Sequence, residues 1–318
     1  MTKEILSSIY DYTLDELKEK LKPSFRAKQV YNWLYKKYAN SYDDMKNLPK
    51  ELIEDLKANY PIDILKVVKK EQSSDGSIKY LFKLRDNHTI EAVLLLMKDK
   101  KIDEDGQIVR SEKYTVCISS QVGCKVGCSF CLTAKGGFVR NLTVGEYIAQ
   151  IVHIKRDNEI AENKALNIVY MGMGEPLDNF DNFVKAVEIF SELDGLAISR
   201  RRQTVSTSGI ASKIKKLGEK DLQIQLAISL HAVDDELRSE LIPMNKAYNI
   251  ASIIEAVKAF PVDTRKKVMF EYLVIKDKND SLDAAKKLVK LLDGIQAKVN
   301  LIYFNPYPGT TYQRPVES

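Results

Sequence analysis

The chain has few cysteines and no long apolar run. Its 318 residues contain four cysteines, all between positions 117 and 131. A disulfide framework would spread its cysteines along the chain, so this cluster favours metal binding in a reducing compartment. The apolar stretch Ala92–Met97 is far too short to span a membrane, and residues 1–13 lack the apolar core of a secretion signal. These absences predict a cytoplasmic protein with no membrane segment.

Charge of one sign is not in large excess either. A net charge of +5 permits an anionic partner such as RNA but does not require one. With 44% hydrophobic residues, a chain of 318 residues can bury the core of one large domain plus a smaller one.

The first third of the chain predicts two kinds of structure. Residues 1–62 predict a helical module with possible RNA contacts, because apolar residues recur at helical spacing. Residues 63–112 predict an extension of antiparallel strands, notably at 79–86 and 89–97, and a charged surface link follows at 98–113.

Residues 113–318 predict parallel strands that alternate with helices. The apolar segments that we interpret as strands are 114–120, 165–173, 202–209, 222–231, 267–275 and 298–306. Six such strands with helices between them favour an α/β fold, a partial parallel (β/α)6 barrel. Active sites of such barrels lie where the strands end. The cysteine cluster and the segments MGMGEP, STSG, SLH and FNPYPG all fall at those positions, which predicts one shared site.

The cysteines form a Cys-x3-Cys-x2-Cys pattern at Cys124, Cys128 and Cys131. Three thiolates on a short loop can bind three irons of a cubane and leave the fourth iron open to a ligand. Zinc is an alternative, with Cys117 as a fourth thiolate, although its spacing differs from that of usual zinc sites. Three cysteines that only pack in a core are the least favoured interpretation.

The cysteine pattern resembles the signature of the radical S-adenosylmethionine (SAM) superfamily. The segments YTVCISSQVGCKVGCSFC, GGFVRNLTVGEYIAQI, NIVYMGMGEPLDN, STSG, LAISLHA, LRSELIPMN and YFNPYPG together are similar to the RNA adenine-C2 methyltransferases called RlmN. The adenine-C8 methyltransferases called Cfr share much of this pattern. The resemblance covers nearly the whole chain and implies a radical SAM partial barrel.

The resemblance implies a [4Fe–4S] cluster and SAM as cofactors. It implies that the metal ligands are Cys124, Cys128 and Cys131. It also implies contacts with SAM from Gly174, Glu175, Ser206, Ser229, Leu230, His231 and Asn305. From the residues alone, a Gly-Glu-Pro turn is more often an ordinary loop, and a histidine at a strand end is often part of the framework.

Two catalytic residues are implied by the same resemblance. Glu91 matches the family's proton acceptor, and Cys117 matches the cysteine that resolves a covalent enzyme–RNA adduct by forming a disulfide bond. From the residues alone, Glu91 is more simply a solvated strand residue and Cys117 part of a core.

The implied reaction is methylation of adenine C2 in 23S ribosomal RNA and in tRNA near the anticodon. It implies an electron donor such as flavodoxin or ferredoxin, and we expect a monomer. Candidate RNA contacts are residues 25–38 and Arg200, Arg201 and Arg202, although Tyr31 and Trp33 equally fit a helical core. The alternatives are C8 methylation, another radical SAM reaction, or a noncatalytic zinc-stabilised RNA-binding protein.

One feature of the family is missing from this sequence. The resemblance places a methyl-carrying cysteine near the C-terminus, but no cysteine follows Cys131. We therefore expect a chain that is truncated at its C-terminus. Such a chain would bind the cluster and SAM but would not methylate RNA, because the nucleophile that carries the methyl group is absent.

Overall fold

The computed structural model describes residues 7–98, 101–102, 108–110, 112–162, 164–262 and 266–316. The chain divides into two compact units. Unit 1 comprises Met1–Val122, Asn141–Met173 and Asp181–Gln203, and unit 2 comprises Gly123–Arg140, Gly174–Phe180 and Thr204–Ser318. None of the helices in the described ranges combines the length and apolarity needed to cross a membrane.

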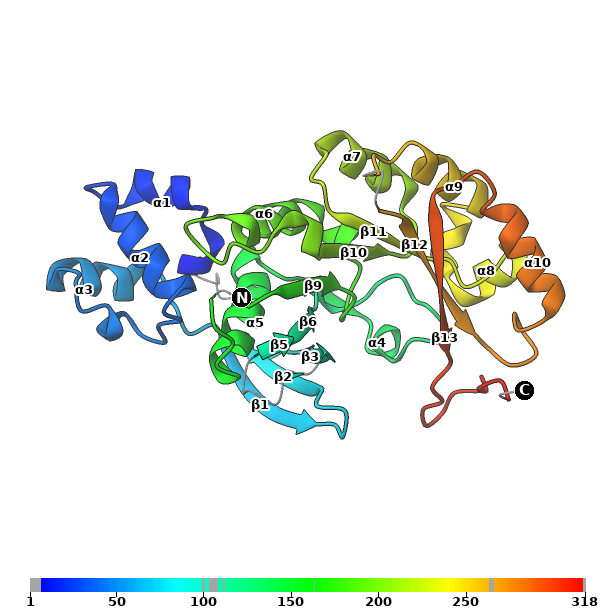
Figure 1. The fold of residues 1–318 in the computed structure, drawn as a ribbon, viewed down its shortest axis with the longest axis horizontal. Coiled ribbons are helices and arrows are strands. Elements are labelled where there is room, and N and C mark those ends of the chain that lie inside the picture. Colours follow the sequence, from blue (N-terminus) through cyan, green and yellow to red (C-terminus); the bar gives the residue numbers. More distant parts are fainter. Residues whose placement is uncertain are drawn as a thin grey trace. The chain divides into compact units, whose positions relative to one another are not determined.

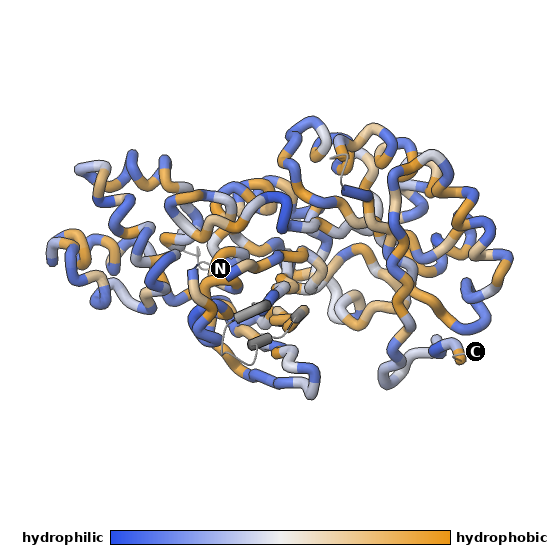
Figure 2. Tube along the Cα trace, viewed as in Figure 1, coloured by the Kyte–Doolittle hydropathy of each residue, from blue (hydrophilic) through white to orange (hydrophobic). Residues whose placement is uncertain are grey.

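Unit 1 begins with the predicted helices. They are the 3-10 helices η1 (Ile9–Asp11) and η2 (Tyr42–Asp44) and the α-helices α1 (Leu14–Lys20), α2 (Phe25–Tyr35) and α3 (Lys50–Asn59) (Figure 1). Thr13 caps α1, since its side chain accepts a hydrogen bond from the backbone N–H of Glu16. Hydrophobic and hydrophilic residues interleave along α1–α3 (Figure 2), and the apolar ones, such as Leu17 and Leu34, are buried.

A sheet follows in unit 1. Its strands are β1 (Leu65–Gln72), β2 (Ile78–Leu84), β3 (Thr89–Lys98), β6 (Lys113–Cys117) and β9 (Leu166–Tyr170). The pairs β1–β2, β2–β3 and β3–β6 are antiparallel, and β6–β9 is parallel. The helices α5 (Val144–Asp157) and α6 (Phe180–Ser191) occupy segments predicted as helices. The antiparallel extension and the first parallel pair are therefore confirmed.

The charged link predicted at 98–113 lies partly outside the described residues. Within it, β4 (Lys101–Ile102) pairs antiparallel with β5 (Ile108–Arg110). A loop was predicted here, so this short pairing is a correction. The predicted division at residues 62 and 112 stays a prediction.

Unit 2 holds a parallel sheet formed by β10 (Gln203–Thr207), β11 (Gln225–Ser229), β12 (Val268–Val274) and β13 (Ala297–Tyr303). Its α-helices are α4 (Leu132–Lys135), α7 (Ala211–Lys220), α8 (Asp235–Leu241), α9 (Ile250–Lys258) and α10 (Leu282–Leu291). The 3-10 helices are η3 (Pro176–Asn179) and η5 (Pro243–Lys246). In unit 1, η4 (Arg200–Arg202) precedes β10. Two short strands, β7 (Gln121–Gly123) and β8 (Phe138–Asn141), flank the cysteine loop.

All six strands predicted for residues 113–318 are present, and the α/β fold with parallel strands is confirmed. Among the described strands the sheets are open, with no closed barrel. The sequence did not predict β1, β7, β8, α4 or α8.

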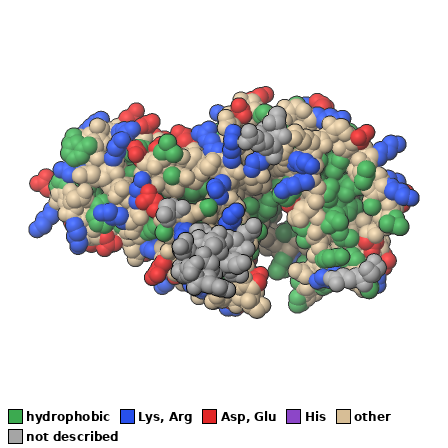
Figure 3. All heavy atoms as spheres, viewed as in Figure 1, with side chains coloured by type: hydrophobic (Ala, Val, Ile, Leu, Met, Phe, Trp, Pro, Cys, Tyr) green, Lys and Arg blue, Asp and Glu red, His purple; other side chains and the backbone are tan. Residues whose placement is uncertain are grey.

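Strand β13 is the outermost strand of the unit 2 sheet and carries exposed apolar side chains. Leu301 is 66% exposed and Tyr303 is 46% exposed. Leu282 and Val289 of α10 are exposed as well. Hydrophobic side chains gather on this part of the surface in the space-filling view (Figure 3).

Candidate active site

The loop of three cysteines in unit 2 has a backbone that only glycine allows at its start. The N–H of Cys124 donates a hydrogen bond to the carbonyl of Gly137 over 2.9 Å. Gly123 has φ +73°, and a Cβ built on it would lie 1.8 Å from that carbonyl oxygen. A side chain at residue 123 would therefore push Cys124 out of its place.

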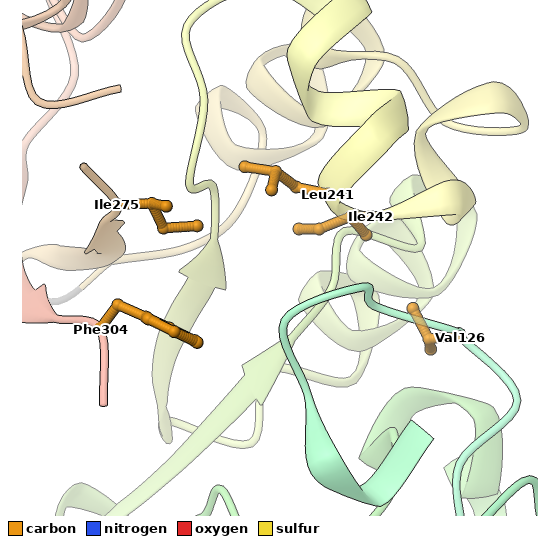
Figure 4. Close-up of a cluster of buried hydrophobic side chains, with 5 residues drawn as sticks. All are labelled: Val126, Leu241, Ile242, Ile275 and Phe304. Carbon is orange, nitrogen blue, oxygen red and sulfur yellow. The ribbon is translucent and has the colours of Figure 1, made fainter. Parts of the chain in front are cut away.

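The middle of the loop is anchored by an apolar cluster. Val126 lies between the first two cysteines and packs with Leu241, Ile242, Ile275 and Phe304 (Figure 4). The side chains of Cys124, Cys128 and Phe130 pack against this cluster and are partly buried. The backbone N–H of Ser129 also donates to the carbonyl of Leu241 over 3.0 Å. The thiols are thus held on a fixed loop beside α8.

Burial keeps the thiols of Cys124 and Cys128 protonated in the absence of metal. It raises the pKa of Cys124 to about 11 and the pKa of Cys128 to about 12. The other cysteines of the loop add to both shifts, because a second thiolate nearby repels the first. A bound cation reverses this balance and deprotonates its thiol ligands. The donor set fits a soft metal centre.

The cysteines do not converge on a single point. Within the described ranges, no group of three His, Cys, Asp or Glu side chains is arranged to hold one metal ion. A cubane needs no such convergence, because each of its three thiolates binds a different iron. All four cysteines are free thiols.

Glu175 lies buried at the start of η3 and organises a neighbouring strand end. Its Oε1 accepts a hydrogen bond from the N–H of Leu177 over 3.1 Å, and its Oε2 accepts one from the N–H of Ser208 over 2.6 Å. Burial raises the pKa of Glu175, and these hydrogen bonds oppose the rise. Gly174, with φ +101°, lets the chain turn just before it.

Arg238 of α8 was not predicted as a site residue. Its guanidinium is fully buried and donates hydrogen bonds to the carbonyls of Ser208, Ser229 and Leu230. These carbonyls lie at the ends of β10 and β11, so one side chain ties the two strand ends together. The sequence signal was the segment LRSELIPMN, but a single sequence does not show that its arginine is buried.

Ser206 and Ser229 point to the same face of the unit 2 sheet. Ser206 is level with Ala227 of β11, and side chains two residues apart share a face of a strand. Both serines are partly exposed. Glu271, level with Ser229 on β12, lies on this face too and accepts a hydrogen bond from Asn300 over 2.7 Å. Burial raises the pKa of Glu271. The sequence analysis missed this pair, which has no motif of its own.

The remaining predicted SAM contacts differ in exposure. Leu230 and His231 are buried, whereas Asn305 is exposed. Nδ1 of His231 accepts a hydrogen bond from the N–H of Leu273 over 3.0 Å. The ring of His231 also meets that of Phe130 edge-on, with centroids 5.0 Å apart. Burial lowers the pKa of His231 to about 3, so the ring is neutral.

The two predicted catalytic residues belong to unit 1. Cys117 ends β6, and burial raises its pKa to about 11. Glu91 on β3 is partly exposed, and its carboxylate lies 2.7 Å from the Nζ of Lys79. The hydroxyl of buried Ser119 donates to the carbonyl of Glu91 over 2.6 Å and accepts from the N–H of Met173 over 3.0 Å. Ser119 thereby joins the strand of Glu91 to the segments that follow β6 and β9.

The candidate RNA contacts include one residue that is buried in the core and others that are exposed at the surface. Tyr31 is fully buried, so its interpretation as a core residue is confirmed. Trp33 is partly exposed, with the Nζ of Lys37 3.9 Å from its ring centroid. Arg200, Arg201 and Arg202 are exposed.

Comparison with known proteins gives the family. The pattern of the radical SAM superfamily matches residues 118–289, and that of the ribosomal RNA large subunit methyltransferase N-terminal domain matches residues 9–62. The chain is 92% identical over 317 residues to the dual-specificity RNA methyltransferase RlmN of Aliarcobacter butzleri, covering 100% of this chain and 88% of that protein. The chain belongs to the RlmN family.

A second RlmN relative and a solved structure agree. The RlmN of Sulfurimonas denitrificans is 66% identical, with 98% of this chain and 87% of that protein covered. A crystal structure of a radical SAM methyltransferase from Sphaerobacter thermophilus superposes with a TM-score of 0.88 at 42% identity, covering 98% of this chain and 89% of that one. Proteins of the RlmN family use a [4Fe–4S] cluster and SAM. The thiol set of the cysteine loop fits the cluster.

Proposed function

We propose that this chain is an RNA methyltransferase that acts on C2 of adenine in 23S ribosomal RNA and in tRNA near the anticodon. C2 of adenine is an electron-poor carbon that does not attack the methyl group of SAM as a nucleophile, so a radical route is required. The observation that carries the proposal is the loop of three part-buried thiols in a chain of the RlmN family. The cluster, when bound, supplies the electron that cleaves SAM.

The residues of unit 2 divide between the two cofactors. Cys124, Cys128 and Cys131 hold the cluster. Glu175 contacts the ammonium group of SAM, since its carboxylate is buried in unit 2 directly after Gly174. The other contacts with SAM come from Gly174, Ser206, Ser229, Leu230, His231 and Asn305. Ser206 and Ser229 share one sheet face, which supports their acting on one ligand.

Unit 1 supplies the groups that act on RNA. Glu91 accepts a proton from the adenine adduct, and Lys79 beside it holds the carboxylate in place. Cys117 acts in product release: its thiolate attacks the sulfur of the family's methyl-carrying cysteine, so that an S–S bond forms as the bond from that sulfur to the carbon of the adduct breaks. Burial raises the pKa of Cys117 and keeps the thiol inert in the resting protein. Ser119 supports this arrangement through its hydrogen bond to Glu91.

The partners follow from this chemistry. RNA binds through the helical module of residues 1–62 and through Arg200, Arg201 and Arg202, whose exposed charges suit phosphates. The reacting base leaves its stack to reach the site. Electrons come from a donor such as flavodoxin or ferredoxin, and the protein works as a cytoplasmic monomer.

Reductive cleavage of SAM tests the proposal. Anaerobically reconstituted protein is mixed with dithionite and SAM, and 5′-deoxyadenosine is measured. This readout needs the cluster and SAM but not the methyl-carrying cysteine that the family places after Cys131. We expect the variants Cys124→Ala, Cys128→Ala and Cys131→Ala to lose both iron and product, while Cys117→Ala keeps both.

Two results would contradict the proposal. Protein that holds zinc instead of iron and sulfide would favour the zinc-stabilised RNA-binding alternative. Cluster-bearing protein that forms no 5′-deoxyadenosine would exclude radical SAM chemistry. Nucleoside mass spectrometry of treated RNA separates the remaining choices. 8-Methyladenosine would favour the C8 alternative, and 2-methyladenosine would support the proposal.

A further inference from the structure

Arg238 is a fully buried cation whose hydrogen-bond partners are all neutral. Its Nε donates to the carbonyl of Leu230 over 3.1 Å, and its Nη2 donates to the carbonyls of Ser208 and Ser229 over 2.6 and 3.0 Å. Its Nη1 donates to Oδ1 of Asn245 over 2.8 Å. Three carbonyls and one amide oxygen accept hydrogen bonds from four of its five N–H donors but do not cancel the charge.

The neighbouring carboxylate does not neutralise this charge directly. Glu175 accepts a hydrogen bond from the N–H of Ser208, whereas Arg238 donates to the carbonyl of the same residue. The backbone of Ser208 therefore lies between the carboxylate of Glu175 and the guanidinium of Arg238. Asp235, whose charge also acts on Arg238, is linked to it through Asn245, which accepts from Arg238 over 2.8 Å and donates to Oδ1 of Asp235 over 3.0 Å. A buried charge without a direct ion pair is costly, and a further anion nearby would stabilise it. Burial lowers the pKa of Arg238 to about 10, which still leaves it cationic at neutral pH.

The cysteine loop lies against the same helix. Ser129 donates its N–H to the carbonyl of Leu241, three residues after Arg238 on α8. Cys124 and Cys128 pack against the cluster that Leu241 and Ile242 help to form. The loop that carries the thiols is therefore in direct contact with the helix that carries Arg238.

We propose that Arg238 is the buried counter-charge of the iron–sulfur cluster on Cys124, Cys128 and Cys131. The inference rests on the function proposed above. A cubane with three thiolate ligands carries net negative charge and becomes more negative on reduction. A fixed cation in a low-dielectric site stabilises the reduced form more than the oxidised form. Arg238 thereby raises the reduction potential and eases electron transfer to the cluster, while it also positions the ends of β10 and β11.

Two variants separate charge from hydrogen bonding. Arg238→Gln removes the charge, Arg238→Lys keeps it, and both lose the guanidinium fork. Lys246→Gln removes an exposed cation of the same unit and is the matched control. The midpoint potential of each reconstituted protein is measured by redox titration with detection of the reduced cluster by electron paramagnetic resonance.

The expected result is a difference between the two variants. At the wild-type midpoint, the ratio of reduced to oxidised cluster should fall about tenfold in Arg238→Gln, which corresponds to about 59 mV for one electron. It should stay within about twofold of the wild type in Arg238→Lys and Lys246→Gln. A wild-type potential in Arg238→Gln would overturn the proposal, and so would equal shifts in the glutamine and lysine variants.

Loss of the cluster is also informative. If Arg238→Gln assembles no cluster while Arg238→Lys retains iron and sulfide, the charge is required and the proposal stands. If both variants lose the cluster and are equally destabilised without it, the arginine acts only through its hydrogen bonds and the proposal fails. Wild-type protein that assembles no cluster would instead refute the proposed function.

Discussion

At the scale of single residues, substitutions of two glycines of the cysteine loop can distinguish the effect of a steric collision from the effect of backbone strain. Gly123 and Gly137 have similar positive φ angles, +73° and +69°. A Cβ on Gly123 would collide with a backbone carbonyl, whereas a Cβ on Gly137 would meet nothing within 4 Å. We expect Gly123→Ala to displace Cys124 and to abolish cluster assembly, in addition to a strain of about 1–3 kcal/mol.

Gly137→Ala is the matched control for this prediction. It should cost about 1–2 kcal/mol from the left-handed backbone alone and keep its cluster. Iron and sulfide per chain after reconstitution, together with urea unfolding of the cluster-free proteins, measure both effects. Equal iron content in the two variants would show that the collision at Gly123 is relieved by movement of the loop.

His231 makes the stability of the cluster-free chain depend on pH. Its pKa is lowered from 6.5 to about 3, by burial first and by the charge of Arg238 second. The histidine takes up a proton near pH 6.5 in the unfolded chain but not in the folded chain. The contribution of His231 to the free energy of unfolding is therefore complete above pH 6.5 and is lost as the pH falls toward 3. Between pH 6.5 and about pH 4 the expected loss is about 3 kcal/mol.

The variant His231→Asn isolates this effect. Asparagine tolerates the positive φ of 58° at this position, and its side-chain oxygen can accept the N–H of Leu273 in place of Nδ1. Urea unfolding of cluster-free protein at several pH values should give a flatter dependence in His231→Asn than in the wild type. Identical slopes would mean that His231 is protonated in the folded chain.

At the scale of elements, Asp11 joins the N-terminal helices to α5 within unit 1. Its Oδ1 accepts a hydrogen bond from the N–H of Gly145 in the first turn of α5 over 2.6 Å, and its Oδ2 accepts one from the N–H of Ser8 over 2.7 Å. A carboxylate at a helix N-terminus satisfies free N–H groups and the helix dipole. We expect Asp11→Ala to lower the free energy of unfolding by about 1–2 kcal/mol.

Asp15→Ala is a suitable control, because Asp15 is exposed and bonds only locally to Lys18. It should change the free energy of unfolding by less than about 0.5 kcal/mol. Asp11→Asn should lose less than Asp11→Ala, since its amide oxygen can still accept one hydrogen bond. If Asp11→Ala unfolds like the wild type, the helical module is held to α5 by apolar packing alone.

The helices and strands that the sequence predicted were those in which apolar residues recur at a clear period. The strands β6 and β9 to β13 and the helices α5, α6, α7, α9 and α10 follow apolar spacing and turn residues. Strand β1 was missed because half of its residues are charged and most are exposed, which hides the alternation. Helix α8 was missed because it is short and follows the SLH motif directly. The cysteine motif predicted the loop, but the roles of Arg238 and Glu271 depend on burial by distant segments.

At the scale of the whole molecule, the outermost strand of the unit 2 sheet, β13, exposes apolar side chains. Val299, Leu301 and Tyr303 lie on one face of β13, two residues apart, and all are exposed. An exposed apolar edge strand offers free backbone groups and hydrophobic surface to a second chain. We expect the 318-residue chain to self-associate at high concentration and Leu301→Lys to reduce this, because a lysine on the edge resists strand pairing.

Leu193→Lys tests whether weaker association in Leu301→Lys results from the change at the edge of the sheet or from the added positive charge. Leu193 is 80% exposed but lies outside any strand or helix, so its replacement adds the same charge without touching a sheet edge. Sedimentation velocity over a range of concentrations should show that association weakens in Leu301→Lys and stays as in the wild type in Leu193→Lys. Equal weakening in both variants would assign association to net charge. A wild type that is monomeric at every concentration would show that β13 is protected by its own twist or by Lys298 beside it.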